Sequence, residues 1–448
     1  MAKLTFVKSQ QLIKQMKKYL PGGVHYNFRY SGKDTIIPFN KGRGSRVWDV
    51  DGNEHLDLFC KFGALMVGHG NQAYNAKLID YMDKVLSVDQ CDLEPIVCER
   101  IVHYVPSAEM VRFCLSGTEA VQNAIRLGRA YAGKPKFVRF RGHYHGNADN
   151  VMGGKPQSTD YPTPMAYEGD FLGTDGRAPH IMEDQSFMLP WNDFAALEQL
   201  VNRYGDEIGV IIMEPICING GGILPKPGYL ESVRQLCDRH HITLIFDEVI
   251  TGFRTALGGA QSLLGVTPDI TVFGKALAGG ALPVSAIVGK KEVMQLYVDQ
   301  KVIHAGTFNG YPLGLAAILA NIELIESDPS AYKRMSNLLF QIGSSLVEAA
   351  KAVDIPMVVQ GVPNILVFHS QAEPLTQPEG YDDNTKLRDI LITRLCKEYG
   401  IQFSPISRFY SNLLMEESDV QFFRDRIGDT MAEVKKLLSL FEGNSLAA

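Results

Sequence analysis

The sequence has no excess of basic charge, no paired cysteine spacing and no long apolar run. It holds 44 Lys and Arg residues against 50 Asp and Glu residues, a formal net charge of −6. That balance lacks the positive field that nucleic-acid binding requires. The seven cysteines show no CxxC pair and no Cys/His zinc spacing, which predicts no metal site and favours a reduced, cytoplasmic setting. No apolar run reaches the ~18 residues of a membrane span, so we expect no membrane insertion.

What is present is an alternation of apolar strand-like segments with helical segments from residue 110 onward. The unbroken apolar character of the strands predicts a mostly parallel sheet that helices cover on both faces, an α/β fold. The predicted strands are 110–115, 136–140, 208–215, 242–249, 269–275 and 284–289, and the predicted helices include 118–133, 228–241 and 313–326.

A chain of 448 residues is long for a single core, so we expect a large domain and a smaller one. Residues 1–60, a helix and a hairpin, are assigned to the small domain, residues 61–312 to the large domain, and residues 313–448 to a connecting helix and a C-terminal α+β part of the small domain. The tract 153–193 has no regular pattern. It is interpreted either as an active-site loop or as a surface insertion.

Polar residues occur at the carboxyl ends of several predicted strands, where open parallel sheets place their functional groups. Ser116, Gly117 and Thr118 stand between a strand and a helix, a position that suits either a phosphate group or a simple N-cap. A P-loop is excluded because Ala276 follows Lys275 where that motif needs Ser or Thr. Glu214 also follows an apolar strand.

Asp247 and Lys275 are charged residues of opposite sign at the ends of apolar strands, so each needs a partner or a function. A buried aspartate caps a helix, is salt-bridged to an arginine, or is paired with a protonated heterocycle. A buried lysine amine becomes a nucleophile unless its head reaches water. The small residues of "ALAGGALP" after Lys275 leave room for a flat group, and Tyr144 in "GHYHG" could stack on one. Together these parts suit pyridoxal 5′-phosphate.

Six motifs in order carry a family resemblance: "SGTEA", "GHYHG", "EPICIN", "FDEVITGFR", "FGKALAGGALP" and "GTFNGYP". The chain resembles the class III pyridoxal-phosphate-dependent aminotransferases of fold type I. It is most similar to the branch that contains glutamate-1-semialdehyde aminomutase, on the evidence of "PGGV" and Asn219. The resemblance implies a large, mostly parallel seven-stranded sheet domain and a smaller α+β domain.

The resemblance also implies roles for individual residues. Lys275 is similar to the lysine that binds the cofactor aldehyde and moves a proton, and Asp247 to the partner of the pyridine nitrogen. Thr307 is similar to a residue that reaches the phosphate of a neighbouring subunit, which implies a homodimer with active sites at its interface. The other implied cofactor contacts are Ser116, Gly117 and Thr118 for the phosphate, Tyr144 and Val249 for the ring faces, Asn219 for the ring oxygen, and Glu214.

The reaction predicted first is transamination. An amino acid donor, with glutamate favoured, passes its amine through the cofactor to an oxo acceptor in ping-pong fashion. This choice rests on departures from the aminomutase pattern at residues 25–29, in 153–193 and around Arg408. Tyr26, Arg29 and Arg408 are the candidate substrate contacts. The alternatives are an intramolecular aminomutase, which is an isomerase, and a non-catalytic relative, with a decarboxylase or racemase less favoured.

Overall fold

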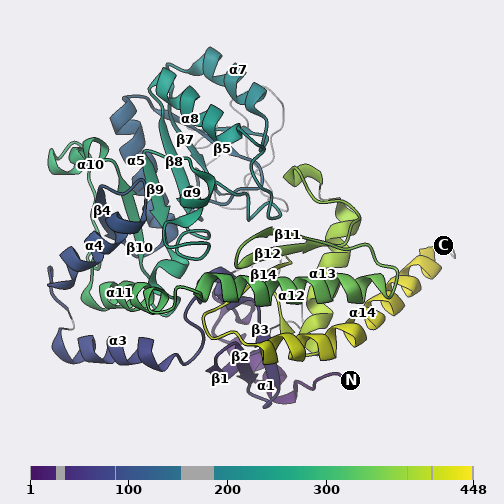
Figure 1. The fold of residues 1–448 in the computed structure, drawn as a ribbon. Helices are drawn as coiled ribbons and strands as arrows, with labels where there is room; N and C mark the ends of the chain where they lie inside the picture. The colour runs from purple at the N-terminus through teal and green to yellow at the C-terminus, as the bar shows by residue number, and fades with distance from the viewer. Residues whose placement is uncertain are drawn as a thin grey trace. The chain divides into compact units, whose positions relative to one another are not determined.

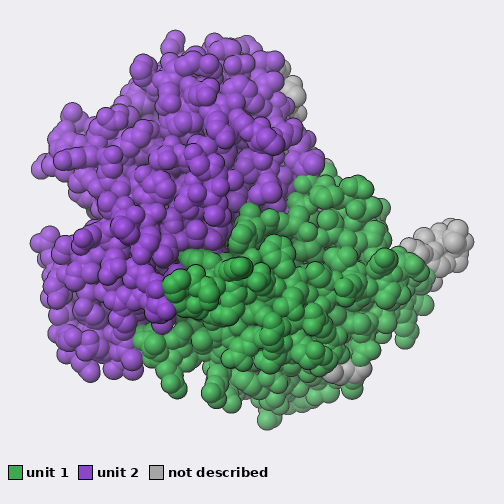
Figure 2. Space-filling model, viewed as in Figure 1, with its two compact units in different colours: residues 1–75, 328–375, 379–448 green, residues 76–327, 376–378 purple. Residues whose placement is uncertain are grey.

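The structure, a computed structural model, describes residues 2–26, 36–85, 87–152, 186–380, 382–404 and 407–445. The chain forms two compact units, shown in different colours in Figure 2: unit 1 comprises residues 1–75, 328–375 and 379–448, and unit 2 comprises residues 76–327 and 376–378. This division differs from the predicted domain boundaries at residues 376–378, which fall in unit 2, and in two further places. Residues 61–75 fall in unit 1, and α11 (Pro312–Glu326) falls in unit 2, where it packs against α4 (Leu93–Tyr104).

Unit 2 is built on a sheet of seven strands, counted over the described residues (Figure 1). Only β10 runs antiparallel to its neighbours, and the other adjacent pairs are parallel. The predicted mostly parallel sheet is therefore confirmed. The strand order is β4 (Met110–Cys114), β10 (Ser285–Gly289), β9 (Ile270–Phe273), β8 (Thr243–Glu248), β7 (Ile208–Met213), β5 (Lys136–Phe140) and β6 (Ser186–Leu189).

The helix α5 (Gly117–Ala132) covers one face of this sheet and packs across β7, β8, β9 and β10. Its apolar residues, including Val121 and Ile125, enter one core with Val210, Ile245 and Ile287 of the strands. All residues of β7 and β8 are buried, as expected for parallel strands with both faces covered. Further helices between residues 72 and 298 are α3 (Gln72–Lys84), α7 (Phe194–Tyr204), α8 (Tyr229–His240), α9 (Gly259–Leu264) and α10 (Lys291–Val298).

The predicted irregular tract 153–193 is wrong at its C-terminal end. Residues 186–189 form β6, which pairs in parallel with β5, and Asp193 caps α7 by accepting from the Ala196 N–H. A four-residue strand beside a long unpatterned tract is too short for apolar alternation to reveal it. Residues 153–185 lie outside the described part of the chain.

Unit 1 is an α+β assembly with its own core. Its described strands form two sheets, β1-β2-β3-β13 and β11-β12-β14. Helices α12 (Ala331–Lys351) and α14 (Glu417–Ser445) pack together, and their apolar residues share one core with Phe368 and Phe409 of the smaller sheet. The elements are α1 (Val7–Met16), β1 (Phe39–Arg43), β2 (Arg46–Asp49), β3 (Glu54–Asp57), α12 (Ala331–Lys351), β11 (Val358–Val362), β12 (Ile365–His369), α13 (Asp383–Glu398), β13 (Ile401–Gln402), β14 (Arg408–Tyr410) and α14 (Glu417–Ser445). No helix in the described part of the chain has the length and apolar character that crossing a bilayer requires.

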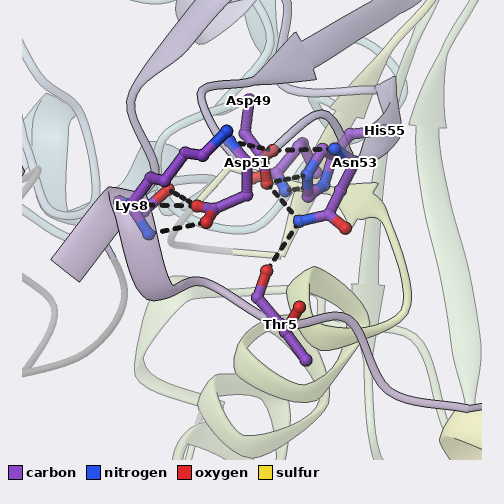
Figure 3. A network of polar contacts seen from close by, with 8 residues as sticks. Thr5, Lys8, Asp49, Asp51, Asn53 and His55 are labelled. Atoms are coloured by element: carbon purple, nitrogen blue, oxygen red, sulfur yellow. Dashed lines mark hydrogen bonds and ion pairs between the residues drawn. The ribbon is translucent and has the colours of Figure 1, made fainter.

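The turn of the β2–β3 hairpin binds the N-terminus of α1 through hydrogen bonds (Figure 3). Asp51 accepts hydrogen bonds from the N–H groups of Lys8 and Ser9, at 2.6 and 2.9 Å, at the free N-terminus of α1. Asp49 accepts from the Asn53 N–H at 2.8 Å and lies 3.1 Å from Nε2 of the buried His55. A carboxylate at a helix N-terminus satisfies donors that the helix itself leaves open. The hairpin therefore holds α1 by its first turn.

Asp269, which precedes β9, is a heavily paired carboxylate at the sheet edge opposite the strand carboxyl ends. It accepts from Arg234 at 2.8 Å, from Lys290 at 2.6 Å and from the Leu244 N–H at 2.8 Å. Burial alone raises the pKa of Asp269, but Arg234 and the hydrogen bonds outweigh burial and lower the pKa below its ordinary value. Its contribution to stability is therefore present above the unfolded-state pKa and is lost as the pH falls through the lower folded-state pKa.

We expect Asp269→Asn to destabilise the protein by about 3 kcal/mol at pH 7, because Arg234 is left without its buried counter-ion. The difference from wild type should shrink as the pH falls below the ordinary aspartate pKa of about 3.9. Urea unfolding at several pH values measures it. Asp299→Asn is the matched control, since its pair with Lys301 is exposed and 3.6 Å long and should contribute less than about 1 kcal/mol. An Asp269→Asn deficit that stays constant throughout the acid range would contradict the assignment.

Candidate active site

Four of the predicted site segments come together at the carboxyl edge of the unit 2 sheet. β4 ends two residues before Ser116, β7 ends directly before Glu214, β8 carries Asp247 next to its last residue, and β9 ends two residues before Lys275. These four strands point the same way, because β4 and β9 are each antiparallel to β10 between them. The carboxyl edge of an open parallel sheet is where ligands bind.

The N-terminus of α5 offers an anion site. Ser116 is the N-cap, and its Oγ accepts from the Glu119 N–H at 3.2 Å. In the described part of the chain the backbone N–H groups of Gly117 and Thr118 have no acceptor. Open N–H groups at the positive end of a 16-residue helix favour a phosphate. The Ser116 oxygen accepts a hydrogen bond as the cap and keeps its O–H proton as a donor, so Ser116 stays a predicted phosphate contact beside the open N–H groups of Gly117 and Thr118.

Glycines allow the neighbouring segments to approach this helix end. A Cβ added at Gly117 would lie 3.1 Å from both methyl groups of Val249, and one added at Gly146 would lie 2.6 Å from Oγ1 of Thr118. The same Thr118 hydroxyl accepts from the Asn147 N–H at 3.3 Å. The predicted ring-face residue Val249 and the "GHYHG" segment are therefore both in contact with Gly117 and Thr118, the predicted phosphate site.

Gly117→Ala should weaken binding of pyridoxal phosphate about tenfold, or about 1.4 kcal/mol, because the new methyl displaces Val249 beside the open N–H groups. Fluorescence titration of the apoprotein with the cofactor measures the dissociation constant. Gly428→Ala is the matched control, since an added Cβ there meets nothing within 4 Å. Equal affinities of Gly117→Ala and wild type for pyridoxal phosphate would contradict the placement of the phosphate site at Gly117 and Thr118.

Asp247 is buried and held from two sides. One carboxylate oxygen accepts from the Val249 N–H at 3.1 Å, and the other lies 2.7 Å from Nδ1 of His145. Both side chains are at most 5% exposed. A carboxylate with four lone-pair directions keeps capacity for a further donor, so a protonated ring nitrogen fits here. His145 was missed as a site residue, because nothing in "GHYHG" indicates which aspartate its ring will meet.

Glu214 hydrogen-bonds to two loops of the site, the "GHYHG" loop and the loop that follows β7. Its two oxygens accept from the Tyr144 N–H at 2.8 Å, the Asn219 side-chain amide at 2.7 Å and the Ile218 N–H at 3.0 Å. Burial raises the pKa of Glu214, and the bond from Asn219 opposes that effect. Its neighbour His143 accepts from the Glu214 N–H at 3.0 Å. Glu214 therefore joins the predicted ring-stacking and ring-oxygen residues, Tyr144 and Asn219, through one buried carboxylate.

Lys275 stands in a left-handed backbone conformation with φ 45°, which costs about 1 kcal/mol or more for a residue with a Cβ. Gly274 before it lies against Val249, with 3.4 Å from a would-be Cβ to the valine methyl. Lys275 begins a short 3₁₀ turn, Lys275–Ala278, whose next three residues are buried. Backbone strain of this kind occurs at functional sites, and here it sets the direction of the lysine side chain.

The remaining predicted contacts are spread over both units. Thr307 is exposed in the single chain. In unit 1, Tyr26 and Arg408 both meet Phe62: the tyrosine and phenylalanine ring centroids are 6.1 Å apart, and the guanidinium carbon of Arg408 lies 5.9 Å from the Phe62 centroid. Arg29 lies outside the described residues.

Phe62 was not predicted, and it sits in an unusual turn. Cys60, Lys61 and Phe62 all have φ between 44° and 55°, so the short segment α2 (Cys60–Gly63) is a left-handed turn and not a regular helix. Asp57 accepts from the N–H groups that enter the turn, including Cys60 at 2.9 Å. No sequence rule marks three consecutive left-handed residues with side chains, so only the structure reveals this turn.

Comparison with known proteins identifies the family. The model of the class-III aminotransferases matches residues 29–428. The chain belongs to this family. Its cofactor is therefore pyridoxal 5′-phosphate, and the donor set described above fits it: open helix N–H groups for a phosphate, a buried carboxylate for a ring nitrogen, and a lysine amine. Across the described residues no group of three or more His, Cys, Asp or Glu side chains could hold a metal ion.

Relatives and solved structures refine this membership. Glutamate-1-semialdehyde 2,1-aminomutase of Syntrophobacter fumaroxidans is 34% identical over 97% of this chain and 99% of its own length. An omega-transaminase from Sphaerobacter thermophilus superposes with a TM-score of 0.87 at 28% identity, covering 95% of this chain and 98% of that one. A glutamate-1-semialdehyde aminomutase from Pseudomonas aeruginosa in complex with PMP has a TM-score of 0.84 at 19% identity, covering 95% and 94%, which speaks for the fold alone.

These relatives correct the predicted reaction. Four further curated proteins, 32 to 39% identical, are also named glutamate-1-semialdehyde 2,1-aminomutase, so transamination as the first choice is wrong. That choice gave weight to bulkier residues at 25–29 and to the long tract from 153, most of which lie outside the described residues. A few substituted side chains in a pocket do not decide between reactions that use the same cofactor and the same lysine.

Proposed function

We propose that this protein is a glutamate-1-semialdehyde 2,1-aminomutase. The observation that carries the proposal is the 34% identity over 97% of the chain to a relative of that name. The reaction moves the amino group from carbon 2 to carbon 1 of one substrate, so that the carbon 1 aldehyde becomes an aminomethyl group and carbon 2 becomes a ketone. Atoms and electrons balance within that molecule, and no external donor or acceptor is consumed.

The residues of the sheet edge supply what this chemistry needs. The N–H groups of Gly117 and Thr118 bind the cofactor phosphate, and the Asp247 carboxylate holds a proton on the ring nitrogen. When bound, pyridoxal phosphate supplies an electron sink for the carbon that loses a proton. The Lys275 amine would hold the cofactor through its aldehyde carbon and would move that proton as a general base and acid.

Tyr144 and Val249 are the proposed contacts to the two faces of the cofactor ring, and Asn219 to its oxygen. The bond network of Glu214 supports the assignment of Tyr144 and Asn219, because one carboxylate fixes both. On the substrate side we assign Arg408 to the substrate carboxylate, with Arg29 as the second candidate for that role, and Tyr26 to another side of the substrate. The shared contact of Tyr26 and Arg408 with Phe62 supports treating them as one group.

The proposed assembly is a homodimer with Thr307 contributing to the partner subunit's phosphate site. Two large apolar side chains close to Thr307 are exposed in the single chain, Ile303 at 73% and Phe308 at 57%. Exposed apolar side chains that gather in one short segment support the proposed contact with another chain there. Sedimentation velocity of wild type and Phe308→Asp tests the assembly: the proposal requires a dimer that the variant weakens.

The reaction is tested with the purified enzyme in its amine-loaded form. Glutamate 1-semialdehyde is added without any amino donor or oxo acid, and formation of the 1-amino-2-oxo isomer is followed. We expect many turnovers per enzyme. In parallel, L-glutamate is added to the aldehyde-loaded enzyme, and release of 2-oxoglutarate is measured. Efficient release of 2-oxoglutarate without any isomerisation of the semialdehyde would overturn the proposal.

A further inference from the structure

The loop that follows Lys275 is held in a conformation that its own sequence does not dictate. Lys275 has φ 45°, and Gly279, which closes the 3₁₀ turn, has φ 70°. The left-handed conformation is natural for the glycine and unfavourable for the lysine. The intervening residues Ala276–Ala278 are buried and have no polar side chain. Something outside the turn must therefore keep Lys275 from relaxing.

Asn321 of α11 makes that contact. It is 0% exposed, and its Nδ2 donates to the carbonyl oxygens of Ala276 at 2.8 Å and Leu277 at 3.2 Å. The surrounding stretch of α11, "LAAILANIELI", is otherwise apolar on the buried side. A fully buried amide is costly unless it is hydrogen-bonded. Here both amide protons are used on the carbonyl oxygens of the two residues that follow Lys275.

The same helix also holds the far end of the loop. Tyr311, the residue before α11, donates its hydroxyl to the carbonyl oxygen of Pro283 at 3.1 Å. Its ring lies against Gly314, where an added Cβ would come within 2.6 Å of a ring carbon. The loop 276–283 is therefore fixed at both ends by α11 and the residue before it, and α11 packs against the 3₁₀ turn between them.

We propose that Asn321 is a positioning residue for the Lys275 amine. With the Ala276 and Leu277 carbonyls held, the chain that leaves Lys275 keeps one path, which holds the Lys275 backbone in its left-handed conformation and sets the direction of its side chain. Proton transfer depends steeply on the distance and angle between the amine and the reacting carbon. The inference rests on the proposed role of Lys275, and it holds for any reaction in which that amine moves a proton.

The test compares Asn321→Leu, which keeps the branched shape of the side chain and removes both donors, with wild-type holoenzyme. Two properties are measured that a purely structural residue would leave unchanged. One is the pKa of the lysine-bound cofactor, taken from its absorbance as a function of pH. The other is the deuterium isotope effect on kcat with glutamate 1-semialdehyde deuterated at carbon 2. We expect kcat to fall at least tenfold, the isotope effect to rise and the chromophore pKa to shift.

Two further variants make every outcome decisive. Asn123→Leu is the matched control: Asn123 is also buried and donates to a backbone carbonyl, that of Glu119 at 3.0 Å, and it should lower only the melting temperature. Should Asn321→Leu not fold, Tyr311→Phe removes only the bond to Pro283 and should change the same two properties to a smaller extent. Unchanged isotope effect and chromophore pKa in the folded variants would overturn the inference. Absence of a lysine-bound chromophore in wild type would instead overturn the role of Lys275.

Discussion

Replacing Lys275 with alanine is expected to leave a folded protein that binds pyridoxal phosphate only non-covalently and has almost no turnover. The change removes the covalent attachment and the group that moves the proton. General acid–base catalysis alone contributes up to ~10⁴-fold, so we expect kcat to fall by at least about 10⁴-fold. The fold should survive, because alanine lacks the long side chain and the apolar residues after position 275 stay in place.

Borohydride reduction followed by peptide mass analysis measures the covalent attachment, and single-turnover kinetics measure the residual activity. Wild type should carry a reduced cofactor on the peptide that contains Lys275, and Lys275→Ala should carry none. Lys301→Ala, an exposed lysine of the same unit, is the control and should behave as wild type. A Lys275→Ala enzyme that keeps a tenth of the wild-type kcat would show that another base moves the proton.

The residues at the carboxyl edge of the unit 2 sheet could largely be predicted, because short stretches of sequence indicate them. Runs such as "LIF" before Asp247 and "ITVF" before Gly274 are buried strands. A charged residue or a glycine directly after such an apolar run is easily recognised in the sequence. Since parallel strands end at one edge, strand prediction alone places Asp247 and Lys275 near each other. The glycine of "SGTEA" likewise indicates close approach, and Val249 makes that approach in the structure.

Contacts between distant segments could not be predicted. His145 meets Asp247 across 102 positions of the chain, and Asn321 meets Ala276 across 45. Each looks like an ordinary histidine of a loop or an ordinary polar residue of a helix. Their partners are set by the packing of one element on another, which residue spacing does not encode. The choice between isomerisation and transamination was missed for a related reason, since both reactions need the same cofactor, aspartate and lysine.

Asp247→Asn is the second change with a large expected effect, because it keeps the shape of the site and removes its charge. The asparagine oxygen can still accept from the Val249 N–H, which donates to Asp247 at 3.1 Å. The new amide faces His145, whose Nδ1 must then accept in place of donating. A carboxylate beside a cation shifts a pKa by about 1 to 3 units, and each unit is about 1.4 kcal/mol. We therefore expect kcat to fall roughly 10- to 10³-fold while the melting temperature changes little.

The loss of kcat in Asp247→Asn should come only from loss of the proton on the ring nitrogen. A cofactor analogue and a second variant separate this effect from a loss of packing. A cofactor analogue methylated at the ring nitrogen carries the positive charge permanently, so it should recover part of the variant's activity and give no gain in wild type. His145→Phe removes the second partner of Asp247 but leaves the charge, so its kcat should fall less than that of Asp247→Asn. If the two variants lost activity equally and the analogue restored neither, the charge of Asp247 would not be what the site uses.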